Sequence, residues 1–249
     1  MSEIRKNYLF NDANLIAYYQ LEGNSNDSKS TNNGTDTAIA YSVANGIFGG
    51  QGAGFNGTTS NVDITHTATL NINGAGSKVS LSAWFNLTAK VGAGARGYII
   101  RKGFDGVNQS NYGLHILGLT GTDSRVDFRV VAGAGRSHYS ATSLNINTWY
   151  HAVATCNFGD TAPIIYLNGK AESLTLEDAS AADYSFPSTT NNVRLGSSSS
   201  GADFFNGNID DAAIFNRILT ASEVALLYNN TKGLINNLRP AIFTPGIAR

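Results

Sequence analysis

The chain has 249 residues and a formal net charge of −1, with charged residues at 14% and hydrophobic residues at 42% of the sequence. A near-neutral charge excludes the basic surface that binding to nucleic acid or to an anionic membrane requires. No apolar run approaches the roughly 20 residues of a transmembrane helix. With 27 glycines and 4 prolines, the composition favours many turns and short strands, and the length suits one large β domain.

The two ends of the chain stand apart from the β pattern. Residues 1–13 form a polar and aromatic N-terminal arm without the apolar stretch of a secretory signal, which favours synthesis in the cytoplasm unless a signal has been removed. Residues 231–249 indicate an extended C-terminal arm, because two prolines interrupt them. We expect this arm to pack on its own domain or on a neighbouring subunit. Its apolar side chains are Leu234, Ile235, Leu238, Ile242, Phe243 and Ile247.

Between the arms, in residues 14–230, some segments show the period-two alternation of strands. In residues 125–131, for example, valine and phenylalanine alternate with arginine and aspartate, which predicts a half-buried strand with a charged face toward solvent. The single Cys156 excludes an intrachain disulfide, and we expect it to be a small buried residue. The predicted strands are residues 15–21, 62–64, 79–87, 98–101, 112–117, 125–131, 149–154, 164–170, 193–196 and 209–215.

Local signals define one turn and one helix. Asn168 and Gly169 suit a two-residue type I′ hairpin turn, because both of its central positions need a positive φ. Thr220 and Glu223 form a capping box, in which each side chain accepts a hydrogen bond from the other residue's backbone N–H. This box predicts a helix over residues 221–228.

Two glycine patterns have the spacing of a dinucleotide-binding loop, at residues 52–57 and 92–97. Such a loop must lie between a strand and a helix, so that the helix N-terminus faces the pyrophosphate. Residues that favour strands follow both patterns, at positions 62–64 and 98–100. We therefore interpret both patterns as turns and expect no nucleotide cofactor.

Several ordered blocks resemble the laminin-G-like, concanavalin A-like jelly-roll family. The blocks are T-W-Y-H at residues 148–151, I-I-Y-L-N-G-K at 164–170, G-N-I-D-D at 207–211 and L-T-A-S-E at 219–223. The resemblance covers residues 14–230. It implies an all-β, two-sheet antiparallel jelly-roll sandwich closed by one short C-terminal helix.

The sequence argues against catalysis. A glycoside hydrolase of this fold needs two carboxyl groups beside the scissile bond, yet none of the five glutamates has an acidic residue two or four positions away. Glu177–Asp178 and Asp210–Asp211 are adjacent, so their side chains point to opposite faces of a strand. Two separate strands could still assemble a pair. No G-x-S-x-G pattern is present, and the four histidines lack zinc-site spacing. We expect a protein that is not an enzyme.

Calcium is the one metal that the family resemblance suggests. Many domains of this superfamily hold a structural calcium, and the resemblance implies that the early loop and the last strand meet near it, with Asp27 and Asp210 as ligands. Calcium prefers carboxylate and carbonyl oxygens. The alternative is that Asp27 organises a turn and that Asp210 accepts hydrogen bonds from backbone N–H groups.

Two groups of loop residues are candidates for contact with sugars, because aromatic rings and amide side chains lie close in sequence. Each group has packing within its own loop as the alternative role. The first comprises Phe104, Asp105, Asn108, Asn111 and Tyr112; the second comprises Tyr184, Asp203, Phe204 and Asn206.

These observations favour non-catalytic recognition or structural display. One hypothesis is a decoration component of a virion-type surface, as on a bacteriophage, that docks on its own or other structural subunits through the C-terminal arm and contacts surface glycans. The alternative is a free, extracellular carbohydrate-binding or adhesion module. A glycoside hydrolase is a third and less favoured hypothesis.

Overall fold

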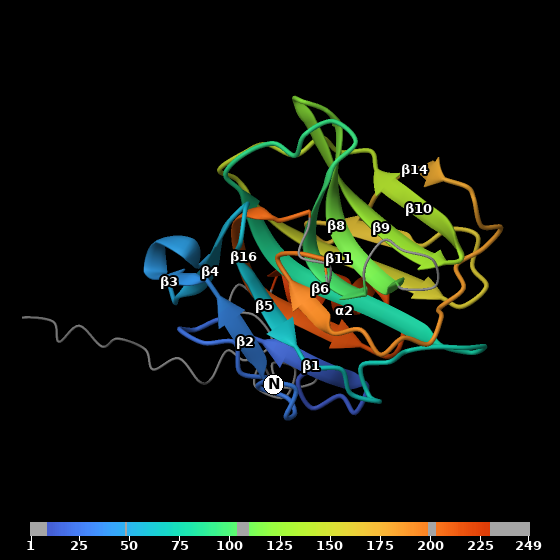
Figure 1. Ribbon diagram of the computed structural model, residues 1–249, viewed down its shortest axis with the longest axis horizontal. Helices are drawn as coiled ribbons and strands as arrows, with labels where there is room; N and C mark the ends of the chain where they lie inside the picture. Colours follow the sequence, from blue (N-terminus) through green and yellow to red (C-terminus); the bar gives the residue numbers. More distant parts are fainter. Residues whose placement is uncertain (1–8, 48, 104–109, 199–202, 230–249) are drawn as a thin grey trace, which may run out of the picture.

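A computed structural model describes residues 9–47, 49–103, 110–198 and 203–229. Strands from both halves of the chain form two antiparallel sheets that pack face to face (Figure 1). The first sheet has the order β13 (Lys170–Ala171), β12 (Ile164–Leu167), β11 (Trp149–Asn157), β6 (Lys78–Leu87), β16 (Asn206–Phe215), β4 (Gly52–Asn56) and β3 (Ala40–Ser42), and β1 (Leu15–Tyr19) also pairs with β16.

The second sheet also has eight strands within the described residues. Its order is β14 (Leu174–Asp178), β10 (Ala134–Ser140), β9 (Asp123–Ala132), β8 (Ser110–Thr120), β7 (Arg96–Gly103), β15 (Val193–Leu195), β5 (Asn61–Ile64) and β2 (Gly34–Thr37). A short 3-10 helix, η1 (Val43–Asn45), follows β3. The expected two-sheet jelly-roll sandwich with one short C-terminal helix, α2 (Ala221–Asn229), is confirmed.

The main core lies between the sheets and follows the alternation of the strands. On β9, Val126 and Phe128 are fully buried against the first sheet, as Leu81 and Phe85 of β6 are against the second. Burial of such side chains contributes roughly 1.5–3 kcal/mol each. The core holds the two sheets together along the whole length of β6.

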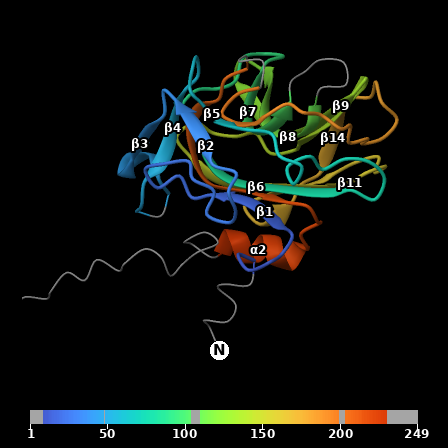
Figure 2. The ribbon, with the colours of Figure 1, turned by 60° about the horizontal axis from the view of Figure 1, so that its bottom comes forward.

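A second apolar cluster lies on the opposite face of the first sheet. There α2 packs beneath β6, β11 and β1 (Figure 2). The cluster contains Leu9, Leu15, Tyr18, Val153, Tyr166, Ala213, Phe215, Leu219, Val224 and Leu227. Because both faces of the first sheet are covered at its centre, β6, β11 and β16 are buried over almost their whole length. None of the described helices has the length and apolar character needed to cross a membrane.

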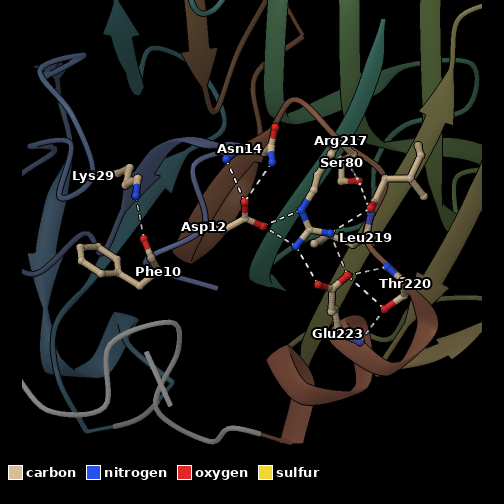
Figure 3. Close-up of polar contacts among 10 residues, drawn as sticks. Phe10, Asp12, Asn14, Lys29, Ser80, Arg217, Leu219, Thr220 and Glu223 are labelled. Carbon is tan, nitrogen blue, oxygen red and sulfur yellow. Dashed lines mark hydrogen bonds and ion pairs between the residues drawn. The ribbon is translucent and has the colours of Figure 1, made fainter. Parts of the chain in front are cut away.

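The predicted local signals are confirmed. Asn168 has a φ of 50° and Gly169 a φ of 77°, as a type I′ turn requires. The Thr220 N–H donates to Glu223 Oε2 at 2.8 Å, and the Glu223 N–H donates to Thr220 Oγ1 at 3.3 Å. Arg217 then joins this capping box to the N-terminal segment, because its guanidinium contacts both Glu223 and Asp12 (Figure 3).

The glycine-rich segment at residues 52–57 is not only a turn, which corrects the prediction. Gly52 and Gly54 lie within β4, and only Gly57, with a φ of 75°, occupies a turn. A Cβ on Gly52 would lie 2.2 Å from the carbonyl oxygen of Asn45. Glycine is present here because the backbone at the end of η1 approaches closely. Strands β2, β3, β10, β13 and β14 were also missed.

Candidate functional site

The outer face of the second sheet carries a set of interlocked polar side chains. In β9 the apolar residues point into the core, so Asp127 and Arg129 point away from it. Neighbouring strands place further polar side chains beside these two. We call this set the outer polar cluster, and it consists of Arg96, His115, Asp127, Arg129, Ser137, Glu177 and Asp178.

The buried end of the outer polar cluster is a histidine–aspartate pair. His115 Nε2 lies 2.7 Å from Asp127 Oδ2, and both side chains are fully buried. Burial lowers the pKa of His115, although the negative charge of Asp127 opposes that effect. The imidazole Nε2 also lies 3.2 Å from Arg96 Nε, so the ring, the carboxylate and the guanidinium form one compact group. Arg96 lies against the same oxygen, with its Nε 3.6 Å from Asp127 Oδ2.

The accessible end of the cluster is formed by Glu177, whose side chain is 30% exposed. Arg96 donates to Glu177 Oε2 at 2.9 Å, Arg129 lies 3.5 Å from the same oxygen, and the Ser137 hydroxyl also donates to it. Arg129 reaches Asp178 at 2.9 Å. Glu177 and Asp178 therefore lie on the same face, which corrects the expectation of opposite faces, because the β10–β14 register shifts at Glu177. The cluster thus joins β7, β8, β9, β10 and β14.

A glycine makes room for this arrangement. A Cβ on Gly135 would lie 2.0 Å from Asp178 Oδ2 and 2.8 Å from Arg129 Nη2. Any larger residue at this position of β10 would separate that ion pair. Burial alone would raise the pKa of Asp178, but the hydrogen bonds from Ser180 and the charge of Arg129 together lower it. Asp178 therefore stays ionised down to a lower pH than an ordinary aspartate does.

Sequence reasoning missed the outer polar cluster, although part of its signal was visible. The alternation in residues 125–131 was interpreted as a charged face toward solvent. Asp127 is instead completely buried, because Arg96 and His115 lie on it. Glu177 comes from a strand 50 residues later in the chain, so no local spacing pattern could pair it with this face.

Asp27 lies in the loop after β1, where it holds the loop together. Its Oδ1 accepts hydrogen bonds from the backbone N–H groups of Tyr18, at 3.0 Å, and Lys29, at 2.9 Å. Its Oδ2 accepts from the backbone and the side chain of Asn32, at 3.2 and 3.1 Å. Four N–H donors therefore face the carboxylate, and such a donor set does not fit a calcium ion at Asp27.

Asp210 lies in β16 and contacts a different part of the chain. Its Oδ2 accepts from the Ile47 N–H at 3.1 Å, and its Oδ1 accepts from the Asp211 N–H at 2.9 Å. The next residue, Asp211, has a φ of 49° at a β-bulge, and the Tyr18 hydroxyl donates to it. The described residues contain no group of three or more His, Cys, Asp or Glu side chains suited to a metal.

Only two of the five residues in the first group of sugar-contact candidates belong to the described part of the chain. Phe104, Asp105 and Asn108 lie outside the described residues. Asn111 and Tyr112 are fully buried. The Asn111 amide donates to the Pro187 carbonyl at 2.7 Å, and the Tyr112 hydroxyl donates to the Leu70 carbonyl at 3.0 Å. These two side chains anchor loops and have no surface to offer a sugar.

The second group does not form one site. Tyr184 is fully buried, and its hydroxyl contacts His138 Nδ1 at 3.0 Å and donates to the Phe128 carbonyl at 3.2 Å. Its backbone pairs with the 157–160 turn, beside the start of β6. Asn206 pairs instead near the end of β6, because Gly207 lies opposite Leu87. The length of β6 therefore separates Tyr184 from the other three residues.

Those three residues do occupy the surface. Asp203 and Asn206 are exposed, and Phe204 is half-buried. Asn206 Oδ1 accepts a hydrogen bond from the Thr88 hydroxyl at 2.7 Å. The six apolar residues of the predicted C-terminal arm lie outside the described residues.

Residues 55–225 match the sequence model of a family described as the concanavalin A-like lectin/glucanases superfamily. No curated protein matches the sequence. Among solved structures, one similar fold is domain 4 of AbnA, a GH43 extracellular arabinanase from Geobacillus stearothermophilus, in complex with arabinotriose. It superposes with a TM-score of 0.62 at 19% identity, over 85% of this chain and 96% of that one.

Two other similar structures are parts of larger chains. The binding domain of botulinum neurotoxin serotype G has a TM-score of 0.63 at 18% identity, over 87% of this chain and 51% of that one. A Trypanosoma rangeli sialidase in complex with 2,3-difluorosialic acid has a TM-score of 0.63 at 16% identity, over 89% of this chain and 34% of that one. At these identities the likeness establishes the fold alone.

Proposed function

This chain belongs to the concanavalin A-like lectin/glucanases superfamily, and from that premise we propose that it is a non-catalytic, lectin-like module that contacts glycans. The observation that carries the proposal is the outer polar cluster. Its donors and acceptors stand on five adjacent strands, which position side chains more rigidly than loops do. Printed descriptions of two structural neighbours name arabinotriose and 2,3-difluorosialic acid as ligands of those proteins.

The chemistry of the cluster suits sugar hydroxyl groups. A hydroxyl both donates and accepts hydrogen bonds, and the cluster offers a carboxylate acceptor in Glu177 beside guanidinium donors in Arg96 and Arg129. Hydrogen bonds to ionised groups are roughly twice as strong as neutral ones. The exposed end of the cluster therefore provides oriented contacts of the kind that fix a bound sugar.

The same geometry argues against hydrolysis. A glycosidase needs one carboxyl group in surroundings that favour its protonated form, so that it can act as the general acid. Each cluster carboxylate faces a basic side chain: Asp127 faces His115 and Arg96, and Glu177 faces two arginines. We therefore assign the cluster to binding.

Glycan binding can be tested by screening the full chain on a glycan array and measuring the best ligand by calorimetry. Glu177→Gln should weaken binding about tenfold, because a hydrogen bond to a charged group contributes about 1.5 kcal/mol. Glu172→Gln is the matched control, since Glu172 accepts only from the Thr142 N–H among the described contacts. Equal binding by both variants, or sugar release by the parent, would contradict the proposal.

We further propose that the module is displayed on a virion-type surface and docks there through residues 231–249. Support comes from the six apolar side chains that the sequence places in this arm. Light scattering of the full chain beside a chain ending at Gly233 tests the idea. An oligomeric full chain and a monomeric truncated chain are expected. Two monomers with equal melting temperatures would instead favour a free extracellular carbohydrate-binding or adhesion module.

A further inference from the structure

Two adjoining hollows lie at the end of the sandwich where β1 and β6 begin and β16 ends. The first has a volume of about 340 Å³ and is lined mainly by polar residues, among them Asn71, Ser77, Lys78 and Asn216. The second has a volume of about 230 Å³, and Leu15, Ile16, Lys29 and Ser30 contribute to its wall. Thr69 lines both hollows, so they lie next to each other, and we call them together the double hollow.

Each hollow contains one lysine, and no aspartate or glutamate lines either of them. The side chain of Lys78 is exposed and makes no hydrogen bond or ion pair with any described residue. Lys29 donates to the Phe10 carbonyl at 2.9 Å, and its Nζ lies 5.5 Å from the centre of the Phe10 ring (Figure 3). Neither ammonium group has a carboxylate partner among the residues that the structure describes.

The nearby carboxylate of Asp12 does not neutralise these lysines. Its oxygens accept from Asn14 and from the guanidinium of Arg217 (Figure 3). Burial would raise the pKa of Asp12, but the bonds from Asn14 and Arg217 lower it overall. Asp12 therefore forms its ion pair with Arg217. The positive charges of Lys29 and Lys78 are not balanced by a carboxylate in the double hollow.

Neutral polar groups beside the lysines are also available to a ligand. The side-chain amide of Asn216, in the first hollow, is exposed and makes no hydrogen bond with the described residues, and the same holds for the hydroxyl of Ser30 in the second. Asn71, in contrast, is held rigid by bonds to Thr189 and Ser188. The double hollow therefore combines fixed walls with free donors and acceptors.

We propose that this double hollow binds an acidic oligosaccharide, with one carboxylate placed at Lys78 and another at Lys29. Amide and hydroxyl groups match sugar hydroxyls, while Leu15 and Ile16 offer apolar surface to the C–H face of a sugar ring. The site lies apart from the outer polar cluster, on different strands. It does not depend on that cluster being a glycan site.

The test measures binding of a hexuronate trimer, a sialylated trisaccharide and a neutral hexose trimer to the full chain by calorimetry. An acidic ligand should bind, the neutral trimer should bind at least tenfold more weakly, and affinity should fall between 20 and 300 mM salt because exposed charges are screened. Lys78→Met and Lys29→Met should each weaken acidic binding about five- to tenfold. Lys170→Met, on the exposed strand β13, is the matched control.

Lys78→Met should leave the fold intact, because the Lys78 side chain is exposed and makes no hydrogen bond or ion pair with the described residues. Equal affinity of the neutral and acidic trimers would overturn the inference, as would absence of binding by both acidic ligands. If Glu177→Gln abolishes acidic binding while Lys78→Met leaves it unchanged, the ligand occupies the outer polar cluster and the inference fails. The reverse pattern supports the double hollow whether or not the outer polar cluster binds any glycan.

Discussion

In both sheets, successive residues of a strand point alternately toward the core and toward the outer face. The outer faces of the two sheets nevertheless have different roles. On the first sheet, outward-facing Tyr18, Val153 and Phe215 form a second apolar cluster under α2. On the second sheet, the outward-facing positions carry the outer polar cluster. A covered face must be apolar because burial of unpaired polar groups is costly. The outer face of the first sheet, which α2 covers, therefore contributes to the stability of the fold. The outer face of the second sheet has polar side chains that can contact a glycan.

The largest expected effect is on the covered face. Phe215→Ala removes a fully buried ring from the cluster under α2, and loss of a buried phenylalanine costs about 3–5 kcal/mol of unfolding free energy. Urea denaturation followed by fluorescence measures the change. Leu176→Ala, at a side chain that is 44% exposed, should stay within about 0.5 kcal/mol. Equal effects of the two substitutions would show that α2 does not stabilise the fold.

A smaller loss of unfolding free energy is expected from a change in the contacts that hold α2 against the first sheet. Arg217 joins Asp12 of the N-terminal segment to Glu223 of the helix, and its carbonyl accepts from Ser80 of β6 at 2.6 Å (Figure 3). Arg217→Gln should cost about 1–2 kcal/mol, since the guanidinium is partly exposed. Hydrogen exchange of the α2 amides should accelerate more than that of β9. An equal acceleration of hydrogen exchange in α2 and β9 would show that Arg217 does not stabilise α2 specifically.

The same contact predicts a pH dependence. The hydrogen bond from Arg217 lowers the pKa of Glu223 from its ordinary value of 4.5, and burial only partly opposes it. A depressed folded-state pKa means that the unfolded state binds more protons. The stabilisation is therefore present above about pH 4.5 and is lost as the pH falls through the folded pKa. Arg217→Gln should flatten this acid decline; an unchanged decline would show that Glu223 does not cause it.

Local chemistry could be predicted from the sequence, and contacts between distant segments could not. The Thr220–Glu223 box and the Asn168–Gly169 turn depend on residues within four positions of each other, so their spacing suffices. Gly52 was misinterpreted because the atom that crowds it belongs to Asn45. Tyr184 and Asn206 were grouped by composition, whereas the pairing along β6 places them apart.

The candidate site was harder to predict than the fold for the same reason. Asp127 and Glu177 meet at Arg96 only after β7, β9 and β14 take their places in the sheet. The alternation in β9 revealed which side chains face outward. Which of them would be covered depended on side chains from other strands.

Glu177→Gln sharpens the comparison, because it should affect recognition and barely affect stability. Glu177 is partly exposed, and a glutamine oxygen can still accept from Arg96. Exposed ion pairs contribute about 0–1 kcal/mol, so the unfolding free energy should fall by less than about 1 kcal/mol. Denaturation and glycan calorimetry on one preparation test both statements. If Glu177→Gln lowers the unfolding free energy as much as Phe215→Ala does, the outer polar cluster stabilises the fold and its assignment to recognition is contradicted.

The smallest effect is expected from calcium, which the family resemblance suggested at the loop and strand that flank the covered face. The Asp27 carboxylate is already surrounded by four N–H donors from Tyr18, Lys29 and Asn32. A cation would have to displace donors whose partial charges have its own sign, and the loop would lose those bonds. The melting temperature should therefore shift by less than about 1 °C between chelator and millimolar calcium. If calcium raises it by several degrees and Asp27→Asn removes that gain, the loop binds the ion, and the first sheet depends on a metal as well as on α2.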